Sequence, residues 1–454
     1  MTKFGFPIDL FCLISFSLGY CACLAAEPDD EFMQGFDDFQ IDAQQQPVKA
    51  DRGWQVGGHL ALLTSYSYAL DDSVEGILKE YAGLSKLQTL LRVHANLQSD
   101  RWRIHAEGRG FRDWFYDHRG KSHFPDSVLD EHGSELEWHE FYLQGRLHGN
   151  VDIKIGRQLL SWGRSDHVRV LDLLNPLDLR EPGSTDIVEI RLPVSMTRLD
   201  YSRGAWSWNL IAIHEVRFNK TPAVGSEFQP RLTGPRAEVT PSDEWAAERA
   251  FRVRGVFPGW DLSMHYAELY ADEPYLDIAD PNEPLLRHSW LRVAGLAFDR
   301  IYGGWLLKGE YARLSGFNLA ADPGHEHSRS DLLLGIEYFG FRDTQIALET
   351  SVQHLHGWQS RFALPPDYRL RDEWQSALRL NRSFANDQVS AVMVALLRGS
   401  QLSDGGIFRA SLEYTPLDGL TLSTGFVLYS KGDTPPLSEL GDRDRILLGL
   451  KYFF

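Results

Sequence analysis

Apolar and polar residues alternate along most of this chain, in segments of about ten to twelve residues from Trp54 onward. The final segment, 445–454, has one wholly apolar face: Ile446, Leu448, Leu450, Tyr452 and Phe454. Successive side chains of a strand point to opposite faces, and closed barrels of such strands satisfy all their backbone polar groups inside a bilayer. The pattern predicts an all-β fold, a closed antiparallel transmembrane β-barrel, with Tyr452 and Phe454 as its C-terminal assembly signal. A soluble β-sandwich is the alternative.

Short joints and longer connections alternate between these segments. The short joints, rich in Gly, Pro, Asn and Asp, lie at 99–101, 148–150, 203–205, 258–259, 299–303, 340–343, 385–387 and 416–419. Eight short joints and nine longer loops predict eighteen strands, with short periplasmic turns and long outer loops. Residues 130–145 and 260–272 alternate poorly, which leaves sixteen strands as an alternative.

The residues before the barrel indicate export. A lysine, an apolar run and small residues near Ala26 predict a signal peptide over 1–26. Residues 27–53 are acidic and are expected to form a flexible periplasmic extension, whose alternative roles are docking of a basic periplasmic partner, a solvated tether, or a plug strand that enters the lumen. The barrel domain then covers 54–454. All three cysteines, Cys12, Cys21 and Cys23, fall in the signal peptide, so thiol catalysis and cysteine metal sites are excluded from the mature chain.

One face of many segments carries ionisable residues, which belong in water. Parity along the segments gives the expected lumen-lining set: Arg103, His105, Glu107, Arg109, Lys154, Arg198, Arg252, Arg254, Arg292, Lys308, Glu310 and Arg379. Basic residues outnumber acidic ones in this set, although the whole chain has a net charge of -17. A positive interior would favour anionic solutes. The alternative is that the charges form bracing salt bridges, with Arg103–Glu107 and Lys308–Glu310 as partners.

The connection over 160–192 is the most distinctive. We expect two helical turns over 167–174, and we expect the loop to fold into the bore because its leucines need a surface to bury against. A long loop with its own structure is usually functional. Folded inward, it would form a constriction of both charge signs: Arg157, Trp162, Arg164, Asp166, Arg169, Asp172, Asn175, Asp178 and Arg180. The alternative is a loop packed outside, over the barrel mouth.

Three short motifs in this region carry a family resemblance: Gly-Arg-Gln at 156–158, Trp-Gly at 162–163 and Asn-Pro-Leu-Asp at 175–178. Together they resemble a family of proteobacterial outer-membrane proteins of undefined function, similar in architecture to the alginate-export porins. The resemblance runs from about Trp54 to the end and implies an outer-membrane barrel. The family's association with a periplasmic lipid carrier and an inner-membrane exporter of the resistance-nodulation-division type implies export of hydrophobic compounds as an alternative role.

We therefore expect a porin-like channel in the outer membrane of a Gram-negative bacterium, in contact with lipid, lipopolysaccharide and the barrel-assembly machinery. An acidic chain without a basic stripe argues against nucleic-acid binding. The histidines have no accompanying Gly-x-Ser-x-Gly signature, so no enzyme is expected. Loop histidines such as His118, His123, His325 and His327 lack a third fixed ligand, and we expect neither a metal nor a cofactor.

Overall fold

The computed structural model describes residues 53–70, 76–165, 167–185, 189–229, 238–239, 248–280 and 283–454. The expected signal peptide over 1–26 and nearly all of the extension over 27–53 lie outside these residues, and so does Asp166 of the expected constriction. These assignments stay predictions.

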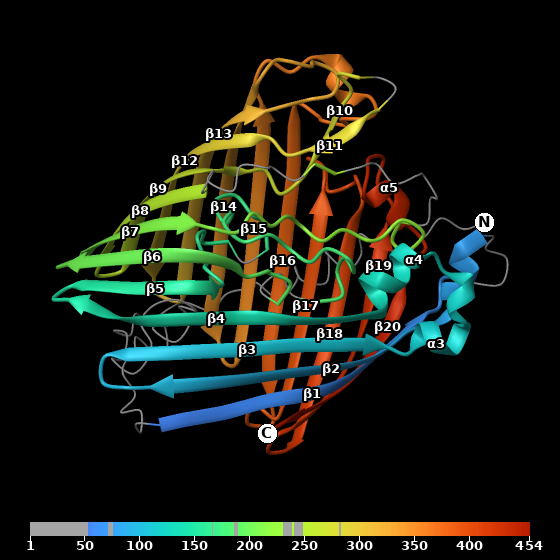
Figure 1. The fold of residues 1–454 in the computed structure, drawn as a ribbon, viewed down its shortest axis with the longest axis horizontal. Coiled ribbons are helices and arrows are strands. Elements are labelled where there is room, and N and C mark those ends of the chain that lie inside the picture. Colours follow the sequence, from blue (N-terminus) through green and yellow to red (C-terminus); the bar gives the residue numbers. More distant parts are fainter. Residues whose placement is uncertain are drawn as a thin grey trace, which may run out of the picture. The chain divides into compact units, whose positions relative to one another are not determined.

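The described residues form an eighteen-stranded antiparallel sheet that closes on itself, because the last strand pairs with the first (Figure 1). The strands are β1 (Gly53–Ser67), β2 (Gly83–Gln98), β3 (Trp102–Asp113), β4 (Ser134–His148), β5 (Val151–Gln158), β6 (Val194–Arg203), β7 (Trp206–Ile213), β8 (Glu248–Phe257), β9 (Trp260–Tyr270), β12 (Trp290–Tyr302), β13 (Trp305–Phe317), β14 (His327–Phe341), β15 (Thr344–Leu355), β16 (Asp372–Phe384), β17 (Val389–Arg398), β18 (Gly406–Leu417), β19 (Leu420–Ser430) and β20 (Arg445–Phe453). The predicted fold class and the count of eighteen strands are confirmed.

Short turns join the strands at one end of the barrel and long connections join them at the other. The short turns fall where the sequence predicted them, with one clear shift: β12 runs to Tyr302, so the joint expected from Asp299 begins at Gly303. Gly303 has φ of 56°, in the left-handed region that such turns require. The long connections hold a small hairpin, β10 (Tyr275–Asp277) with β11 (Leu285–Arg287), and short helical segments: η1 (Gly76–Tyr81), α3 (Phe115–Arg119), η2 (Lys121–His123), α4 (Asp126–Val128), η3 (Leu129–Gly133), η4 (Ser360–Ala363) and α5 (Leu437–Leu440). Across the part of the chain described, no helix is both long and apolar enough to cross a bilayer.

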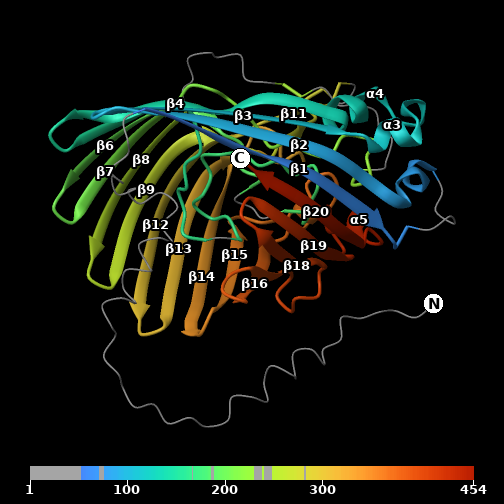
Figure 2. The ribbon, with the colours of Figure 1, turned by 90° about the horizontal axis from the view of Figure 1, so that it is seen from below.

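The two faces of the wall differ as the alternation predicted. Outward residues of β1 such as Val56, Leu60 and Leu62 are 68%, 46% and 44% exposed, and they are apolar. Inward residues are buried where connections fold against them, as Glu310 on β13 and Glu349 on β15 show. Figure 2 views the wall from another side, with irregular segments running within the ring of strands. An apolar exterior with a polar, partly filled interior is the arrangement of a transmembrane barrel.

Candidate functional site

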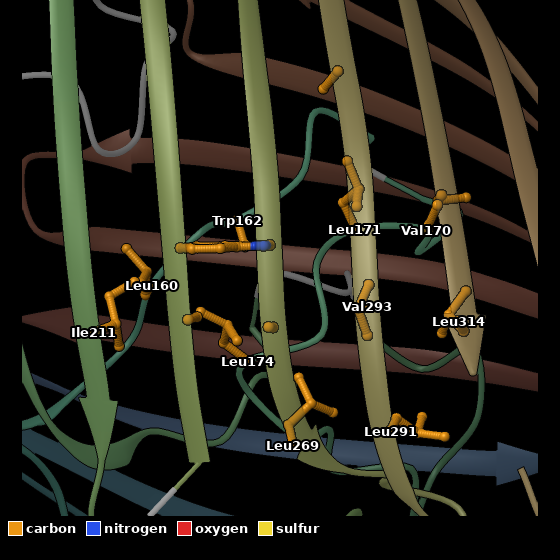
Figure 3. Close-up of a cluster of buried hydrophobic side chains, with 14 of the residues drawn as sticks. Leu160, Trp162, Val170, Leu171, Leu174, Ile211, Leu269, Leu291, Val293 and Leu314 are labelled. Carbon is orange, nitrogen blue, oxygen red and sulfur yellow. The ribbon is translucent and has the colours of Figure 1, made fainter. Parts of the chain in front are cut away.

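The connection between β5 and β6, residues 159–193 and here called loop 3, folds into the barrel. Leu160, Trp162, Leu171 and Leu174 of this loop form one buried cluster with inward residues of β6, β7, β9, β12 and β13. Figure 3 shows these side chains beside Ile211, Leu269, Leu291, Val293 and Leu314 of the wall. Gly295 on β12 makes room for the loop, since a Cβ there would lie 2.3 Å from Cδ2 of Leu171. The leucines of the loop, which were predicted to need a surface to bury against, thus pack against the inner wall.

The first half of loop 3 crosses the bore to the opposite wall. Glu310 on β13 accepts hydrogen bonds from the backbone N–H groups of Arg164, Ser165 (3.0 Å) and Leu171 (3.0 Å). Glu349 on β15 accepts one from Oγ of Ser165 at 2.6 Å. β15 lies eight positions from β5 in a ring of eighteen strands, which is almost directly across. Two buried carboxylates therefore hold the loop's backbone to the far wall.

Arg164 extends this attachment through two ion pairs. Its guanidinium lies 2.6 Å from Asp261 on β9 and 3.0 Å from Asp299 on β12. Asp261 also pairs with Arg254 at 2.6 Å. Arg252, two residues before Arg254 on the same face of β8, has its guanidinium carbon 5.3 Å from the ring centre of Trp162. A mixed set of charges from β8, β9 and β12 thus meets the loop in the middle of the barrel.

The second half of loop 3 runs the other way, to β2 and β18–β19. Lys86 on β2 binds both carboxylate oxygens of Glu181 at 2.8 Å. The hydroxyl of Tyr429 on β19 donates to the carbonyl of Pro182 at 2.6 Å. Gly183, with φ of 78°, packs so closely on Ile407 of β18 that a Cβ would meet it at 2.6 Å. Loop 3 is therefore tied to the wall on both sides of the bore.

Residues 214–229, the described start of the connection between β7 and β8 and here called loop 4, also cross the barrel. Glu227 is 5% exposed and pairs with Arg445 on β20 at 2.7 Å, while Phe228 packs on Tyr429. Burial raises the pKa of Glu227, and the neighbouring arginines only partly offset it. A cavity of 20 Å³, about the size of one water molecule, lies where these groups meet Lys86 and Tyr81. The sequence analysis did not predict that this second loop folds inward.

Several expectations for loop 3 are wrong. Residues 167–174 form bends and no helical turns. Asp172, Asn175 and Arg180 are only 2%, 1% and 6% exposed and do not face a solute; Asp172 and Asn175 hold the loop's own fold, and Arg180 also pairs with Glu135 on β4. Asn175, for example, accepts a hydrogen bond from the N–H of Leu160 at 2.8 Å.

The remaining predicted loop residues have other contacts. Arg157 belongs to β5 and contacts Glu215 at 3.3 Å. Arg169 donates to the carbonyl of Asn175, and Asp178 pairs with Arg180. Three arginines of the predicted constriction form ion pairs outside the loop: Arg164 with Asp261 on β9 and Asp299 on β12, Arg169 with Asp272 just after β9, and Arg180 with Glu135 on β4.

The predicted lumen-lining residues lie mostly on the inner face. Glu310, Arg252, Arg254 and Arg109 face loop 3 or its partners, and the others share their parity or register: Arg103, His105, Glu107, Lys154, Arg198, Lys308 and Arg379. The prediction that Arg292 lines the lumen is wrong. This residue alternates with the buried Leu291 and Val293, lies opposite Glu268, and is exposed on the outer face.

Many of the inner charges form ion pairs, as the salt-bridge alternative expected. The expected partners differ, because Glu107 pairs with Arg92 at 3.3 Å and Lys308 with Glu337. Parity also missed three inward aspartates, Asp261, Asp299 and Asp331. Among the described residues no group of three or more His, Cys, Asp or Glu side chains is placed to hold a metal ion.

Comparisons with known proteins agree with this architecture. OccAB2 of Acinetobacter baumannii superposes with a TM-score of 0.52 at 10% identity, over 88% of this chain and 98% of its own. OccAB4 of the same species gives 0.51 at 10% identity, over 88% and 98%. OccD3 (OpdP) of Pseudomonas aeruginosa gives 0.50 at 9% identity, over 88% and 91%. At such identities the likeness is one of fold.

No curated protein matches the sequence. A family model described as a protein of unknown function, DUF1302, matches residues 80–454. The expected likeness to alginate-export porins is not tested by these comparisons and stays a prediction. Because the match covers all strands from β2 to β20, which is well over half of the chain, the chain belongs to the DUF1302 family of proteins of unknown function.

Proposed function

We propose that this protein is a porin-like channel of the outer membrane of a Gram-negative bacterium, passing small hydrophilic, mainly anionic solutes. The observation that carries the proposal is loop 3, which spans the inside of a closed eighteen-stranded wall and is tied to it on both sides. A loop across the bore narrows the passage and leaves selection by size and charge to the remaining lining. The fold shared with outer-membrane porins supports the same reading.

The outer surface supports the membrane location. Trp206, Trp260, Tyr302 and Trp305 are exposed beside the short turns, where an aromatic girdle would meet the inner membrane interface. Above them the outer wall is apolar and would contact lipid and lipopolysaccharide, while Tyr452 and Phe454 at the last strand would serve the assembly machinery. The acidic extension over 27–53 would bind a basic periplasmic partner.

Hydrophobic cargo fits the interior less well. The inner wall carries paired charges over most of its strands, and the apolar inward residues of β6 to β13 are already covered by loop 3. A lipid track would need an apolar inner surface that is accessible from the bore. We therefore do not favour the lipid-export alternative.

The test is to refold the mature chain into planar lipid bilayers and to record single-channel currents and the reversal potential across a potassium chloride gradient. Small, ohmic steps with preference for chloride are expected. A folded, heat-modifiable barrel that passes no current, or one that prefers potassium, would contradict the proposal.

A further inference from the structure

The outer face of the barrel carries a polar patch at the long-connection end of four adjoining strands, β12 to β15 (the yellow to orange strands in Figure 2). This outer patch consists of Arg292 on β12, Tyr311 and Arg313 on β13, Ser328 and Ser330 on β14, His354 on β15 and His356 just after it. Its strand residues face outward, because they share the parity of exposed leucines on the same strands: Leu296, Leu307, Leu332 and Leu348.

Arg313 is the centre of the outer patch. Its guanidinium donates hydrogen bonds to Oγ of Ser328 at 2.7 Å and to Oγ of Ser330 at 3.1 Å. Oγ of Ser330 also lies 2.9 Å from Nε2 of His356 and 3.3 Å from the hydroxyl of Tyr311. A guanidinium, three hydroxyls and an imidazole therefore form one connected polar group on the outside of the wall.

Positive charge is in excess at this centre. In the described part of the chain no carboxylate pairs with Arg313, whose hydrogen bonds go to neutral hydroxyls. The groups that act electrostatically on His356 are Arg313 and His354. The nearest acid on β16 is Asp372, which lies 2.6 Å from Nδ1 of His354. The charge of Arg313 is thus left for an anion from outside the protein.

Arg292 adds a second guanidinium beside the first. In the β12–β13 register Arg313 is its diagonal neighbour, with the two residues about 7–8 Å apart. Its side chain is 58% exposed, and its contact with the equally exposed Glu326 is 3.5 Å long. On its other side Glu268 is bound by Arg249. Exposed ion pairs of this kind are weak, so Arg292 is able to turn to an anion that Arg313 holds.

The outer patch lies at the height of a lipid headgroup. The register row directly below it is apolar and aromatic: Leu296, Tyr311, Leu332, Val352 and Trp374. Arg313 is eight positions from Trp305 at the short-turn end of β13. Eight positions span about 27 Å along a strand, or about 21 Å across the membrane at a tilt of about 40°, against an apolar band about 25 Å tall. Arg313 therefore sits at the outer edge of this band.

We propose that Arg313 and Arg292, with the hydroxyls of Ser328 and Ser330, bind a phosphate group of lipopolysaccharide in the outer leaflet. The side of the wall decides the class of ligand, because solutes in the bore do not reach the outer face and the anions at this height are lipid headgroups. Planar guanidinium groups bind phosphate oxygens in pairs, and hydroxyls complete the contacts.

The chemistry of lipopolysaccharide matches this arrangement. It carries phosphates on a sugar directly above its acyl chains, as the outer patch places arginines and hydroxyls directly above an apolar wall. The inference needs the outer-membrane location but is independent of conduction. A barrel that passes no current and still binds lipopolysaccharide here would end the proposed function and leave this inference standing.

The test measures equilibrium binding of labelled deep-rough lipopolysaccharide, and of the same lipid after removal of its phosphates, to the folded protein in detergent micelles. The variant is Arg292→Gln with Arg313→Gln. The matched control, Arg300→Gln with Arg342→Gln, removes two exposed arginines at the short-turn end of β12 and β14. Heat-modifiable migration checks folding, and Arg313→Gln alone replaces the double variant if that variant does not fold.

The native protein and the control should bind the phosphorylated lipid about tenfold more tightly than the dephosphorylated one, as charge-assisted hydrogen bonds at a wet surface provide. The double variant should lose this preference. No preference in the native protein, or an unchanged preference in the variant, overturns the inference. Displacement by inorganic phosphate, or equally tight binding of phosphatidylglycerol, overturns it as well, since the site would then take free phosphate or any anionic phospholipid.

Discussion

Replacing Glu310 by alanine should detach the first half of loop 3 from the far wall. The Glu310 carboxylate is 2% exposed and accepts three backbone N–H groups of the loop, from Arg164, Ser165 and Leu171. Each buried N–H that loses its acceptor costs about 1–3 kcal/mol. Three would cost about 3–9 kcal/mol, and water from the bore would replace part of the loss, so we expect about 3 kcal/mol. This is about a hundredfold in the population of the detached segment.

Hydrogen–deuterium exchange of peptides covering 160–174 measures this population directly. Protection of the Ser165 and Leu171 amides should fall about a hundredfold, while the amides of β13 itself stay protected. Single-channel records should show a larger mean conductance and more flicker. The matched control is Glu413→Ala, an exposed inward glutamate on β18. Unchanged exchange and conductance in Glu310→Ala, or an equal effect in the control, would show that the buried leucines alone hold the loop.

Three further predictions follow from the same interior. Arg164→Ala removes one positive charge and exposes Asp261 and Asp299, so the chloride-to-potassium permeability ratio should fall about twofold in reversal-potential measurements; an unchanged ratio would place the passage elsewhere. Gly295→Ala puts a Cβ 2.3 Å from Leu171 and 2.7 Å from a backbone oxygen, so overpacking should cost about 1–3 kcal/mol and lower the thermal midpoint, and Gly108→Ala, where a Cβ meets nothing within 4 Å, serves for comparison in the same melt. Burial raises the pKa of Asp272 to about 7, above its unfolded value near 4, so the folded loop after β9 favours the protonated carboxyl. The free energy of unfolding of this loop should therefore be greatest at low pH and fall by up to about 4 kcal/mol as pH rises from 4 to 7. Hydrogen–deuterium exchange of peptides over 271–280 should follow this trend, and Asp272→Asn should abolish it.

The strands were predictable because outward residues face one uniform solvent. Lipid demands an apolar side chain at every second position, and tight turns demand Gly, Pro, Asn or Asp between strands. The failures have local causes. Residues 260–272 alternate poorly at the end of β9, because loop 3 covers the inward Ala267 and Leu269 while the outer face carries the charged Glu268. Residues 130–145 alternate poorly because a bulge on β4 lies opposite the Glu107–Gly108 step and interrupts the register.

The interior was less predictable, because its contacts join residues that lie far apart in the sequence. Parity assigned most basic residues to the inner face, but one slip in the alternation moved Arg292 to the wrong side, since a shift of one residue reverses every side chain. Parity also cannot pair a residue with a partner far away in the chain. Glu310 with Arg164, Lys86 with Glu181 and Arg445 with Glu227 are separated by at least 95 residues each.

The sequence by itself determined the closed barrel, its eighteen strands and the positions of its turns, because alternation and turn chemistry are local properties of the chain. Only the tertiary structure decided what fills the bore. Loops 3 and 4 cross it because buried carboxylates and arginines on distant strands, brought together by closure of the sheet, satisfy backbone N–H groups and charges that would otherwise be buried without partners. Closure is a long-range event, and no pattern within a single strand encodes which wall a loop will reach.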